Sequence, residues 1–443
     1  MSITETVKSP DHIYQLCVRS FGADRARLVT GDAFRIADEK QRVILSPRNL
    51  GELSEMLMFA SREKLIVIPA GAGTWLEMGN PPVRAHVVIS TAQMNRVLEY
   101  EPADLTASVE AGCTLAEFNA MARRHRQCIP LDPFGAPEST LGAIVATASA
   151  GPLRCAYGTP RDQVIGMRVV HANGSMTKAG GKVVKNVAGY DLCKLYTGSY
   201  GTLGIIGEIN FKLRSLAEHE RTMHFFSQDA SVLCDLALQI MDSDAQPAAM
   251  ELFCLRFDRL KIDYGEGRFT LALRFINPPE MVQAQMAEAI RLGAGCRHTF
   301  LSESDATTFW HDYDEEETAA DQEIILRISA LPSDTAAMLG EIGATIPQAA
   351  FRVHAANGVI RIHGKADTLA DFKRRQRPLR LAEMRQFVQS RGGQMTILRL
   401  PPELKNALDA WGHPGPTGAL MLALKQKFDP GSLLNPGRFV NGI

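Results

Sequence analysis

The segment FRVHAANGVIRIHG, residues 351–364, alternates polar and apolar residues around an Asn-Gly pair, which predicts a β-hairpin. Arg352 and His354 share one face of the first strand. Arg361 and His363 share one face of the second. Histidine serves as a general base near neutral pH and arginine holds a carboxylate through paired hydrogen bonds, so these four residues are the candidate catalytic residues. A solvated hairpin face is the alternative interpretation of the same pattern.

Three segments rich in glycine and hydroxyl residues lie upstream of this hairpin. PAGAGT, residues 69–74, follows an apolar run that predicts a strand, and its glycines let successive N–H groups point into one anion-binding concavity. STLGAIVATASAG, residues 139–151, and KNVAGYDLCKLYTGSYGTLGIIGE, residues 185–208, repeat the combination of small residues and hydroxyl donors. Taken singly, such segments fit a plain turn or close helix–sheet packing. Together they favour a large, flat, phosphate-bearing cofactor held in extended form along the backbone.

Two common nucleotide-binding motifs do not account for these segments. The dinucleotide fingerprint G-x-G-x-x-G fails because the residues from Gly71 read Gly-Ala-Gly-Thr-Trp-Leu and lack the third glycine. The P-loop motif G-x-x-x-x-G-K-[ST] does not occur in the sequence. The cofactor site is therefore expected to differ from both.

The spacing of apolar runs and turns indicates mixed α and β structure in the first half of the chain. Residues 47–63 predict an amphipathic helix that opens at a proline, and apolar runs on either side of PAGAGT predict strands. The Asn173-Gly174 pair predicts a hairpin, and residues 204–213 predict a strand. After about residue 216, glycine-rich loops become rarer and helices rich in Ala, Met and Leu are expected. The fold class is α+β.

The composition argues against several classes of protein. A formal net charge of -1 over 443 residues gives no basis for binding nucleic acid. The 8 cysteines form no C-x-x-C pair, which argues against a zinc site or an iron–sulfur cluster held by this chain and fits a reducing cytoplasm. The amino-terminal residues lack the apolar stretch of a signal peptide, and no apolar run approaches the ~18 residues of a membrane span. His311, Asp312 and Asp314 fit a solvated acidic surface better than a metal site, so we expect no metal.

The order of these segments resembles the vanillyl-alcohol-oxidase family of flavoproteins, whose FAD-binding domain is of the PCMH type. The resemblance rests on PAGAGT, STLGAIVATASAG, AYGTPRDQVIGMRVVHANG, KNVAGYDLCKLYTGSYGTLGIIGE and FDPGSLLNPGRF. It is strong over residues 38–217 and 415–443 and weak over residues 218–395. The KNVAGYD…GSYGTLG segment and the LNPGRF tail are most similar to the smaller flavin-binding subunit of bacterial glycolate oxidase.

This resemblance implies an FAD-binding domain of two α/β subdomains and a second α+β domain that caps the substrate. The implied division is an amino-terminal segment at 1–37, the FAD domain at 38–217, the cap at 218–395 and a segment at 396–443 that returns to the FAD site. Position by position, the implied FAD contacts are Pro69, Ala70, Gly71, Ala72, Gly73, Thr74, Thr140, Leu141, Gly142, Ala146, Tyr157, Gly158, Arg161, Asp162, Gly204, Ile206, Asn435 and Pro436.

Two positions depart from the pattern of the family. Some members tether the flavin through a histidine in the first loop, where this chain has Gly73 or a near neighbour, so we expect non-covalent FAD. Many family dehydrogenases have a glutamate where this chain has Tyr200. The glycolate oxidase subunit resembles this chain at that position, which supports the narrower resemblance.

The resemblance implies oxidation of a small 2-hydroxy acid, such as glycolate, to the 2-oxo acid. In that reaction FAD accepts hydride, a base takes the hydroxyl proton and a cation holds the carboxylate. The implied partners are a second flavin subunit and an iron–sulfur subunit, and we expect a cytoplasmic protein that reaches a membrane only through them. A non-catalytic accessory or electron-relay subunit is the main alternative. A reductase of the cell-wall-precursor type shares the FAD fold but lacks the NPGRF tail.

Overall fold

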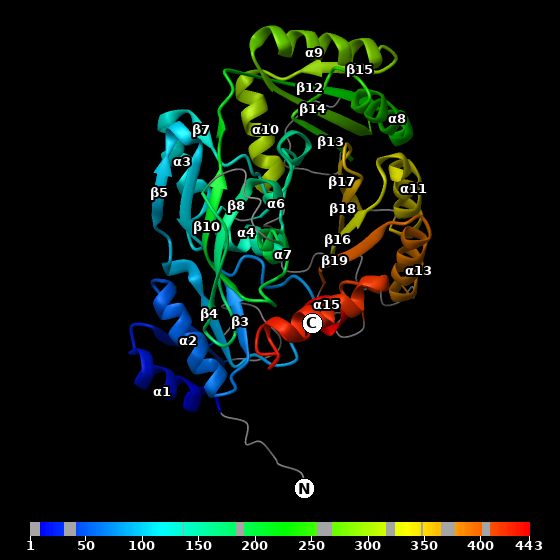
Figure 1. The fold of residues 1–443 in the computed structure, drawn as a ribbon. Coiled ribbons are helices and arrows are strands. Elements are labelled where there is room, and N and C mark those ends of the chain that lie inside the picture. Colours follow the sequence, from blue (N-terminus) through cyan, green and yellow to red (C-terminus); the bar gives the residue numbers. More distant parts are fainter. Residues whose placement is uncertain are drawn as a thin grey trace.

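Three large β-sheets and the helices around them form the computed structural model of this chain (Figure 1). It describes residues 9–30, 41–135, 137–182, 190–254, 268–315, 324–346, 349–364, 377–400 and 408–443. Two short strands outside these sheets, β7 (Gln127–Cys128) and β11 (Arg214–Ser215), pair with each other. Of the third glycine-rich segment, residues 185–189 lie outside the described residues.

The first sheet supports the first glycine loop. Its strand order is β1 (Ala26–Thr30), β2 (Gln41–Leu45), β4 (Val87–Ser90) and β3 (Val67–Ala70), with β1 antiparallel to β2 and the other pairs parallel. Helices α1 (Pro10–Phe21) and α2 (Leu50–Arg62) share its apolar core. The helix predicted at 47–63 starts later than its proline, because the Asn49 side chain caps it by accepting the N–H of Glu52 (3.0 Å).

The second sheet is antiparallel and carries the other two glycine-rich segments. Its strand order is β5 (Val97–Glu101), β6 (Thr106–Glu110), β10 (Ile205–Lys212), β8 (Val164–Val170) and β9 (Met176–Gly180). The same region contains α3 (Leu115–Ala122), α4 (Leu141–Thr147), α5 (Arg154–Tyr157), α6 (Pro160–Gln163) and α7 (Leu192–Tyr196). The hairpin predicted at Asn173-Gly174 is β8–β9, and the strand predicted at 204–213 is β10.

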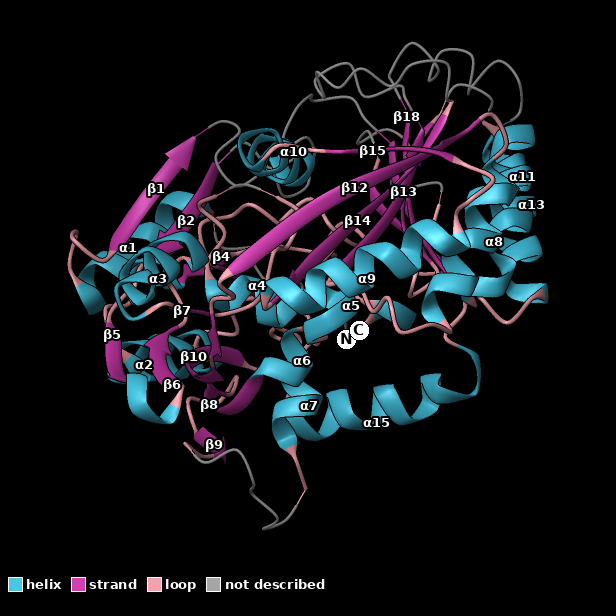
Figure 2. Ribbon diagram, turned by 90° about the horizontal axis from the view of Figure 1, so that it is seen from above, coloured by secondary structure: helices cyan, strands magenta, loops and turns pink. Residues whose placement is uncertain are grey.

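The third sheet is also antiparallel and differs between its two faces. Its strand order is β15 (Arg297–Phe300), β12 (His219–Ser227), β14 (Phe269–Asn277), β13 (Ala249–Cys254), β17 (Ala350–His354), β18 (Val359–Gly364), β16 (Ile324–Ser329) and β19 (Gln394–Arg399). Side chains alternate between the faces of a sheet, and here one face is apolar. That face packs on α8 (Ala230–Met241), α9 (Pro279–Leu292), α11 (Thr335–Thr345) and α13 (Arg377–Ser390), whereas α10 (Glu303–Glu315) lies on the other side (Figure 2).

The carboxyl-terminal segment crosses back to the first sheet. After α15 (Gly418–Phe428), the chain runs beside Val67 of β3. The N–H of Val67 donates to the carbonyl of Leu433 (2.8 Å), and the carbonyl of Val67 accepts the N–H of Asn435 (3.0 Å). The buried Lys425 ammonium ties α15 to the second sheet by donating to the carbonyl of Thr202 (2.9 Å). The carboxyl-terminal segment thus meets the glycine loops, while the domain division at residues 37, 217 and 395 stays a prediction.

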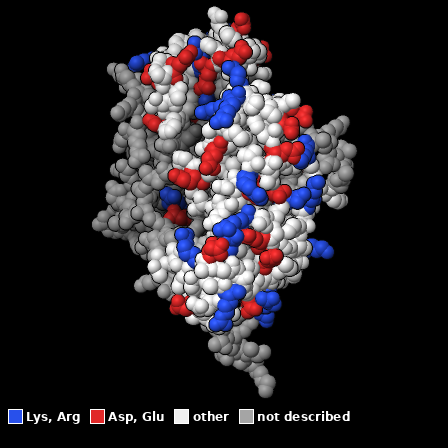
Figure 3. Space-filling view, turned by 90° about the vertical axis from the view of Figure 1, so that its left-hand side faces the viewer, with Lys and Arg blue, Asp and Glu red and all other residues white. Residues whose placement is uncertain are grey.

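Charged side chains of both signs are intermixed on the face drawn in Figure 3. Among the described residues in that view, no extended basic patch is seen. No helix in the described part of the chain is both long and apolar enough to cross a membrane.

Candidate active site

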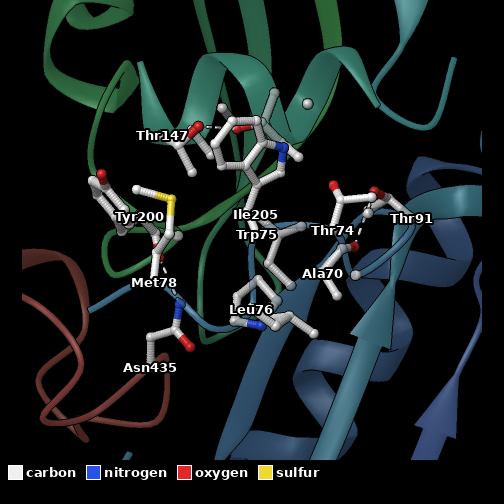
Figure 4. Close-up of a pocket in the computed structure, with 18 of the residues that line it drawn as sticks. Ala70, Thr74, Trp75, Leu76, Met78, Thr91, Thr147, Tyr200, Ile205 and Asn435 are labelled. Carbon is white, nitrogen blue, oxygen red and sulfur yellow. Dashed lines mark hydrogen bonds between the residues drawn. The ribbon is translucent and has the colours of Figure 1, made fainter. Parts of the chain in front are cut away.

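A pocket lies where the glycine-rich segments meet the returning carboxyl terminus (Figure 4). Ten of the implied FAD contacts line it: Pro69, Ala70, Gly71, Gly73, Thr74, Gly142, Ala146, Gly204, Ile206 and Asn435. It is also lined by residues that were not among the implied contacts: Trp75, Leu76, Met78, Thr91, Ala143, Thr147, Tyr200, Gly201, Ile205 and Arg438.

The first glycine loop presents free backbone donors at the end of β3. The N–H groups of residues 71–74 donate to no protein acceptor within the described part of the chain. Ser90 fixes the loop from the neighbouring strand by donating to the carbonyl of Gly71 (2.8 Å). Gly73 has a φ of 93°, a region that residues with a side chain rarely adopt. Successive free N–H groups of this kind form a concavity that binds an anion such as pyrophosphate.

The first and second glycine-rich segments approach each other closely because Gly71 has no side chain where it meets Thr140, and Gly142 packs in the same way on Ala111. Thr140 caps α4 by accepting the N–H of Ala143 (3.3 Å). A Cβ on Gly71 would lie 2.1 Å from the Thr140 hydroxyl oxygen, and a Cβ on Gly142 would lie 2.7 Å from the Cβ of Ala111. Both positions therefore require glycine if these loops are to pack as they do.

Tyr200 joins the third segment to the carboxyl-terminal return at the edge of the pocket. It has a φ of 54°, which is uncommon for a bulky residue. Its carbonyl accepts from the Asn435 amide (2.6 Å), and its ring lies 4.8 Å from that of Trp411 and 5.1 Å from that of Phe439. Strained backbone that is held by so many contacts is typical of ligand sites.

The polar face of the third sheet carries the four candidate catalytic residues. The hairpin predicted at 351–364 is β17–β18, and its register places the four side chains on one face of the sheet. Arg352, His354 and Arg361 are only 2%, 3% and 6% exposed, so the interpretation as a solvated face is wrong. The physical reason is that Phe134, from the loop after β7, covers this face and stacks on His354 at 5.5 Å.

Three arginines lie side by side across neighbouring strands of this face. Arg352 is directly opposite Arg361, which is directly opposite Arg327 of β16. Like charges at opposed positions destabilise a sheet, so the row favours a bound anion or aromatic contacts. Arg352 lies over the ring of Tyr313 (4.4 Å), and Arg361 lies over that of Phe134 (4.4 Å). The side chain of Arg327 makes no hydrogen bond or ion pair with the residues that the structure describes, and burial lowers the pKa of its guanidinium group.

Tyr200 connects this row to the glycine-lined pocket. It lines the pocket and lies within electrostatic reach of Arg327, Arg361 and Arg438. Burial raises the pKa of Tyr200, and the positive charges of these arginines oppose that rise. Burial also lowers the pKa of Arg438 to about 10. Tyr200, which lines the pocket, is therefore also within electrostatic reach of two arginines of the row.

The two candidate histidines differ in how firmly they are held. His354 is stacked on Phe134, and its Nδ1 lies 2.7 Å from a carboxylate oxygen of Glu251. His363 lies nearer the end of β18, is half-buried and pairs in register with Ala350. A general base needs a fixed orientation, so the geometry favours His354.

Residues 42–180 match the protein family described as "FAD binding domain". They run from β2 to β9 and include the first two glycine-rich segments. This part of the chain is similar to FAD-binding domains. The family therefore agrees with the cofactor that the free donors and small residues of the pocket indicate.

Curated relatives resemble about half of the chain. It is 34% identical over 208 residues to the glycolate oxidase subunit GlcD of Bacillus subtilis, covering 47% of this chain and 44% of that protein. It is 33% identical over 210 residues to the mitochondrial D-lactate dehydrogenase [cytochrome] of Arabidopsis thaliana, covering 47% and 37%. It is 32% identical over 179 residues to the mitochondrial D-2-hydroxyglutarate dehydrogenase of Bos taurus, covering 40% and 33%. The matches thus span less than half the length of these relatives.

Solved structures resemble nearly the whole chain at low sequence identity. An alkyldihydroxyacetonephosphate synthase has a TM-score of 0.72 and 16% identity, covering 96% of this chain and 86% of that one. A p-cresol methylhydroxylase with substrate bound has a TM-score of 0.71 and 15% identity, covering 97% and 96%. These likenesses show the fold alone, and they confirm the predicted α+β class with a PCMH-type FAD-binding domain.

The residues of the pocket fit FAD. The free N–H groups of residues 71–74 suit the pyrophosphate, and Gly142 and Ala146 leave room for a flat ligand close to the backbone. Among the described residues that line the pocket, none is a histidine or a cysteine that could form a covalent bond to a flavin.

Eight implied contacts do not line the pocket among the described residues: Ala72, Thr140, Leu141, Tyr157, Gly158, Arg161, Asp162 and Pro436. Leu141 is instead buried in the core of the second sheet. Asp162 caps α6 by accepting the N–H (2.8 Å) and hydroxyl (3.0 Å) of Thr159. A role for these eight residues in holding FAD stays a prediction. Of the lining residues that were missed, Arg438 had a signal, because it belongs to the NPGRF tail.

Within the described part of the chain, no group of three or more His, Cys, Asp or Glu residues could hold a metal ion. His311 lies on α10, is exposed and contacts its neighbour Asp312 at 3.4 Å. The side chain of Asp314 lies outside the described residues.

Replacing Asp132 by asparagine is expected to flatten the pH dependence of folding stability in the apoprotein. Burial raises the pKa of Asp132 from 3.8 to about 7. A carboxyl with a raised folded-state pKa binds more protons when folded, so its contribution to stability is lost as the pH rises from about 4 to about 7. Asp132→Asn should therefore melt at a higher temperature than the native chain at about pH 8 and at a similar temperature near pH 4. Thermal unfolding at both pH values measures this.

The matched control is Asp229→Asn, because Asp229 is an exposed helix cap whose pKa is lowered by hydrogen bonds from Ser231. It should show no gain at about pH 8. A native chain and an Asp132→Asn variant with the same pH dependence would contradict the assignment of this carboxyl.

Proposed function

We propose that this chain binds FAD non-covalently in the pocket and oxidises a small 2-hydroxy acid, such as glycolate, to the 2-oxo acid. The observation that carries the proposal is the row of Arg352, Arg361 and Arg327 beside the pocket. A carboxylate bound there would neutralise the row and place the acid next to the cofactor. The relatives named for glycolate, D-lactate and D-2-hydroxyglutarate support the same class of substrate.

The residues of the site then have separate tasks. Arg327 is half-buried and lacks a partner among the described residues, so it would hold the substrate carboxylate, with Arg361 beside it. His354 would take the hydroxyl proton. Phe134 and α10 cover the polar face and would exclude water from it. Bound FAD would supply the acceptor for the hydride.

The test is a visible absorption spectrum of the purified chain, reconstituted with FAD and mixed anaerobically with glycolate, D-lactate or D-2-hydroxyglutarate. We expect flavin absorbance that is released as free FAD on denaturation, and bleaching by at least one of these acids. Acetate is the matched control, because it has the carboxylate but no hydroxyl group to oxidise. A chain that takes up no FAD would contradict the site itself.

Bound flavin that stays oxidised with every acid would instead favour an accessory or electron-relay subunit. The observation that keeps this second candidate open is that the relatives' matches cover less than half of their length. We also propose a second flavin subunit and an iron–sulfur subunit as electron-accepting partners, since the first of these relatives is itself named a subunit. A cytoplasmic location, with contact to the inner face of a membrane through such partners, belongs to the same proposal.

A further inference from the structure

Glu251 is a buried carboxylate on the polar face of the third sheet. It is 1% exposed and is the direct cross-strand neighbour of His354. One carboxylate oxygen lies 2.7 Å from His354 Nδ1, and the other accepts the hydroxyl of Tyr313 at 2.7 Å. All the strong contacts of this carboxylate are therefore to two side chains of the candidate site.

Burial of such a group is not explained by stability. Removing a carboxylate from water costs several kcal/mol, and a buried ion pair often returns no more than well-packed apolar residues would. Ala249 and Phe253, which flank Glu251 on the same face of β13, are buried apolar residues, so an apolar residue at position 251 would be compatible with the sheet. The arrangement is better explained by what the carboxylate does to the imidazole.

A carboxylate only accepts hydrogen bonds, which decides where the proton of the imidazole lies. Because Glu251 accepts at Nδ1, the neutral His354 ring carries its proton there and leaves the lone pair on Nε2. The Nε2 atom makes no hydrogen bond within the part of the chain that the structure describes. Phe134 stacks on the ring at an interplanar angle of 19° and limits its rotation.

We propose that Glu251, itself held by Tyr313, is a positioning residue that fixes His354 with Nε2 ready to accept a proton. The inference rests on the proposed oxidation of a 2-hydroxy acid. In that reaction Nε2 of His354 would take the hydroxyl proton, and the carbon that bears the hydroxyl would become the carbonyl of the 2-oxo acid. Bound FAD would supply the acceptor for the hydride lost from that carbon. The Glu251 carboxylate then stabilises the imidazolium that has formed. The cations Arg352 and Arg361 face the same space through contacts with Tyr313 and Phe134, and they oppose that stabilisation. Arg154 is also within electrostatic reach of Glu251 and opposes it, whereas Asp132, which is within reach as well, adds to it when ionised.

The test compares Glu251→Gln with the native chain by stopped-flow measurement of flavin reduction across pH. The amide keeps the shape of the carboxylate and removes its charge. We expect the maximal reduction rate to fall by about 100-fold with FAD content and KM little changed, and the acid limb of the pH profile to move to lower pH. Glu220→Gln is the matched control, because it breaks a carboxylate contact with Arg274 (2.8 Å) on the same sheet without touching His354. It should reduce flavin at the native rate.

Tyr313→Phe serves as a second variant, because it weakens the support of Glu251 and leaves the carboxylate in place. It should reduce flavin about 5- to 10-fold more slowly than the native chain, which also decides the matter if Glu251→Gln does not fold. Native reduction rates and an unmoved pH profile in Glu251→Gln, or a native rate in Tyr313→Phe, would overturn this inference and leave the proposed function standing. A native chain whose flavin no 2-hydroxy acid bleaches would instead contradict the proposed function, and this inference with it.

Discussion

Alanine in place of Gly71 is expected to abolish FAD binding. The added Cβ would lie 2.1 Å from the Thr140 hydroxyl oxygen and 3.1 Å from two carbons of the same side chain. Thr140 would have to leave its place as the cap of α4, at a cost of about 1 kcal/mol, and the two loops would separate. The free N–H groups of residues 71–74 would then no longer converge on one anion. Flavin absorbance of the purified variant, and titration of its apoprotein with FAD, measure the loss.

The matched control for this change is Gly340→Ala. A Cβ at Gly340 meets nothing within 4 Å, and alanine stabilises the interior of a helix such as α11 relative to glycine by about 1 kcal/mol. This variant should bind FAD as the native chain does and melt at the same temperature or higher. A Gly71→Ala variant that carries a full complement of FAD would show that the two loops do not form the pyrophosphate site.

The glycine loops could be predicted from the sequence because their signal is local. PAGAGT starts in the last two residues of β3, and its six consecutive small residues predict the loop in which Gly73 adopts a positive φ. The β17–β18 hairpin was predictable for the same reason, since alternation and an Asn-Gly pair lie within 14 residues. What those patterns could not show is the environment of the polar face. Alternation is typical of a solvated hairpin, and here the face is covered by Phe134, more than 200 residues earlier in the chain.

The partners of His354 were not predictable because they come from distant segments. Glu251 lies in AMELFC, and Tyr313 lies in an acidic stretch that suggested a solvated surface. Neither carries a local signal, and only the pairing of β13 with β17 brings Glu251 to His354.

For Tyr157 and Asp162 the sequence implied a contact with FAD that the pocket lining does not include. A resemblance transfers residue types, but in this structure Asp162 caps a helix and Tyr157 does not line the pocket.

Arg327 could not be predicted as a site residue from the sequence, because no local pattern marks it. It is the one charged residue of the strand IILRIS, which reads as an ordinary buried strand. Its importance follows from register, because β16 pairs with β18 and brings Arg327 directly opposite Arg361. A row of like charges that neighbouring strands create has no trace in either strand alone.

Methionine in place of Arg327 is expected to lower kcat/KM for the 2-hydroxy acid by about 100-fold, mainly through KM. A two-pronged arginine–carboxylate contact in a desolvated site is worth about 3 kcal/mol, which corresponds to a factor of that size. Methionine fills a similar volume, and Arg327 forms no contact with another described charged group that its loss would leave unpaired. Steady-state kinetics with an artificial electron acceptor, alongside the FAD content of the variant, measure the effect.

Two further variants test whether the rise in KM depends on the planar guanidinium group and on the position of Arg327 in the sheet. Arg327→Lys keeps the charge but not the planar fork, so it should recover part of the affinity, to about tenfold below the native chain. Arg274→Met removes an arginine from the same face of the same sheet, where it is already paired with Glu220 (2.8 and 3.0 Å), and should leave KM unchanged. If Arg274→Met raised KM as much as Arg327→Met does, the acid would be attracted by the general positive field of this face. If Arg327→Met alone raised KM, the carboxylate would be bound at Arg327, the end of the arginine row that interacts electrostatically with Tyr200 of the FAD pocket.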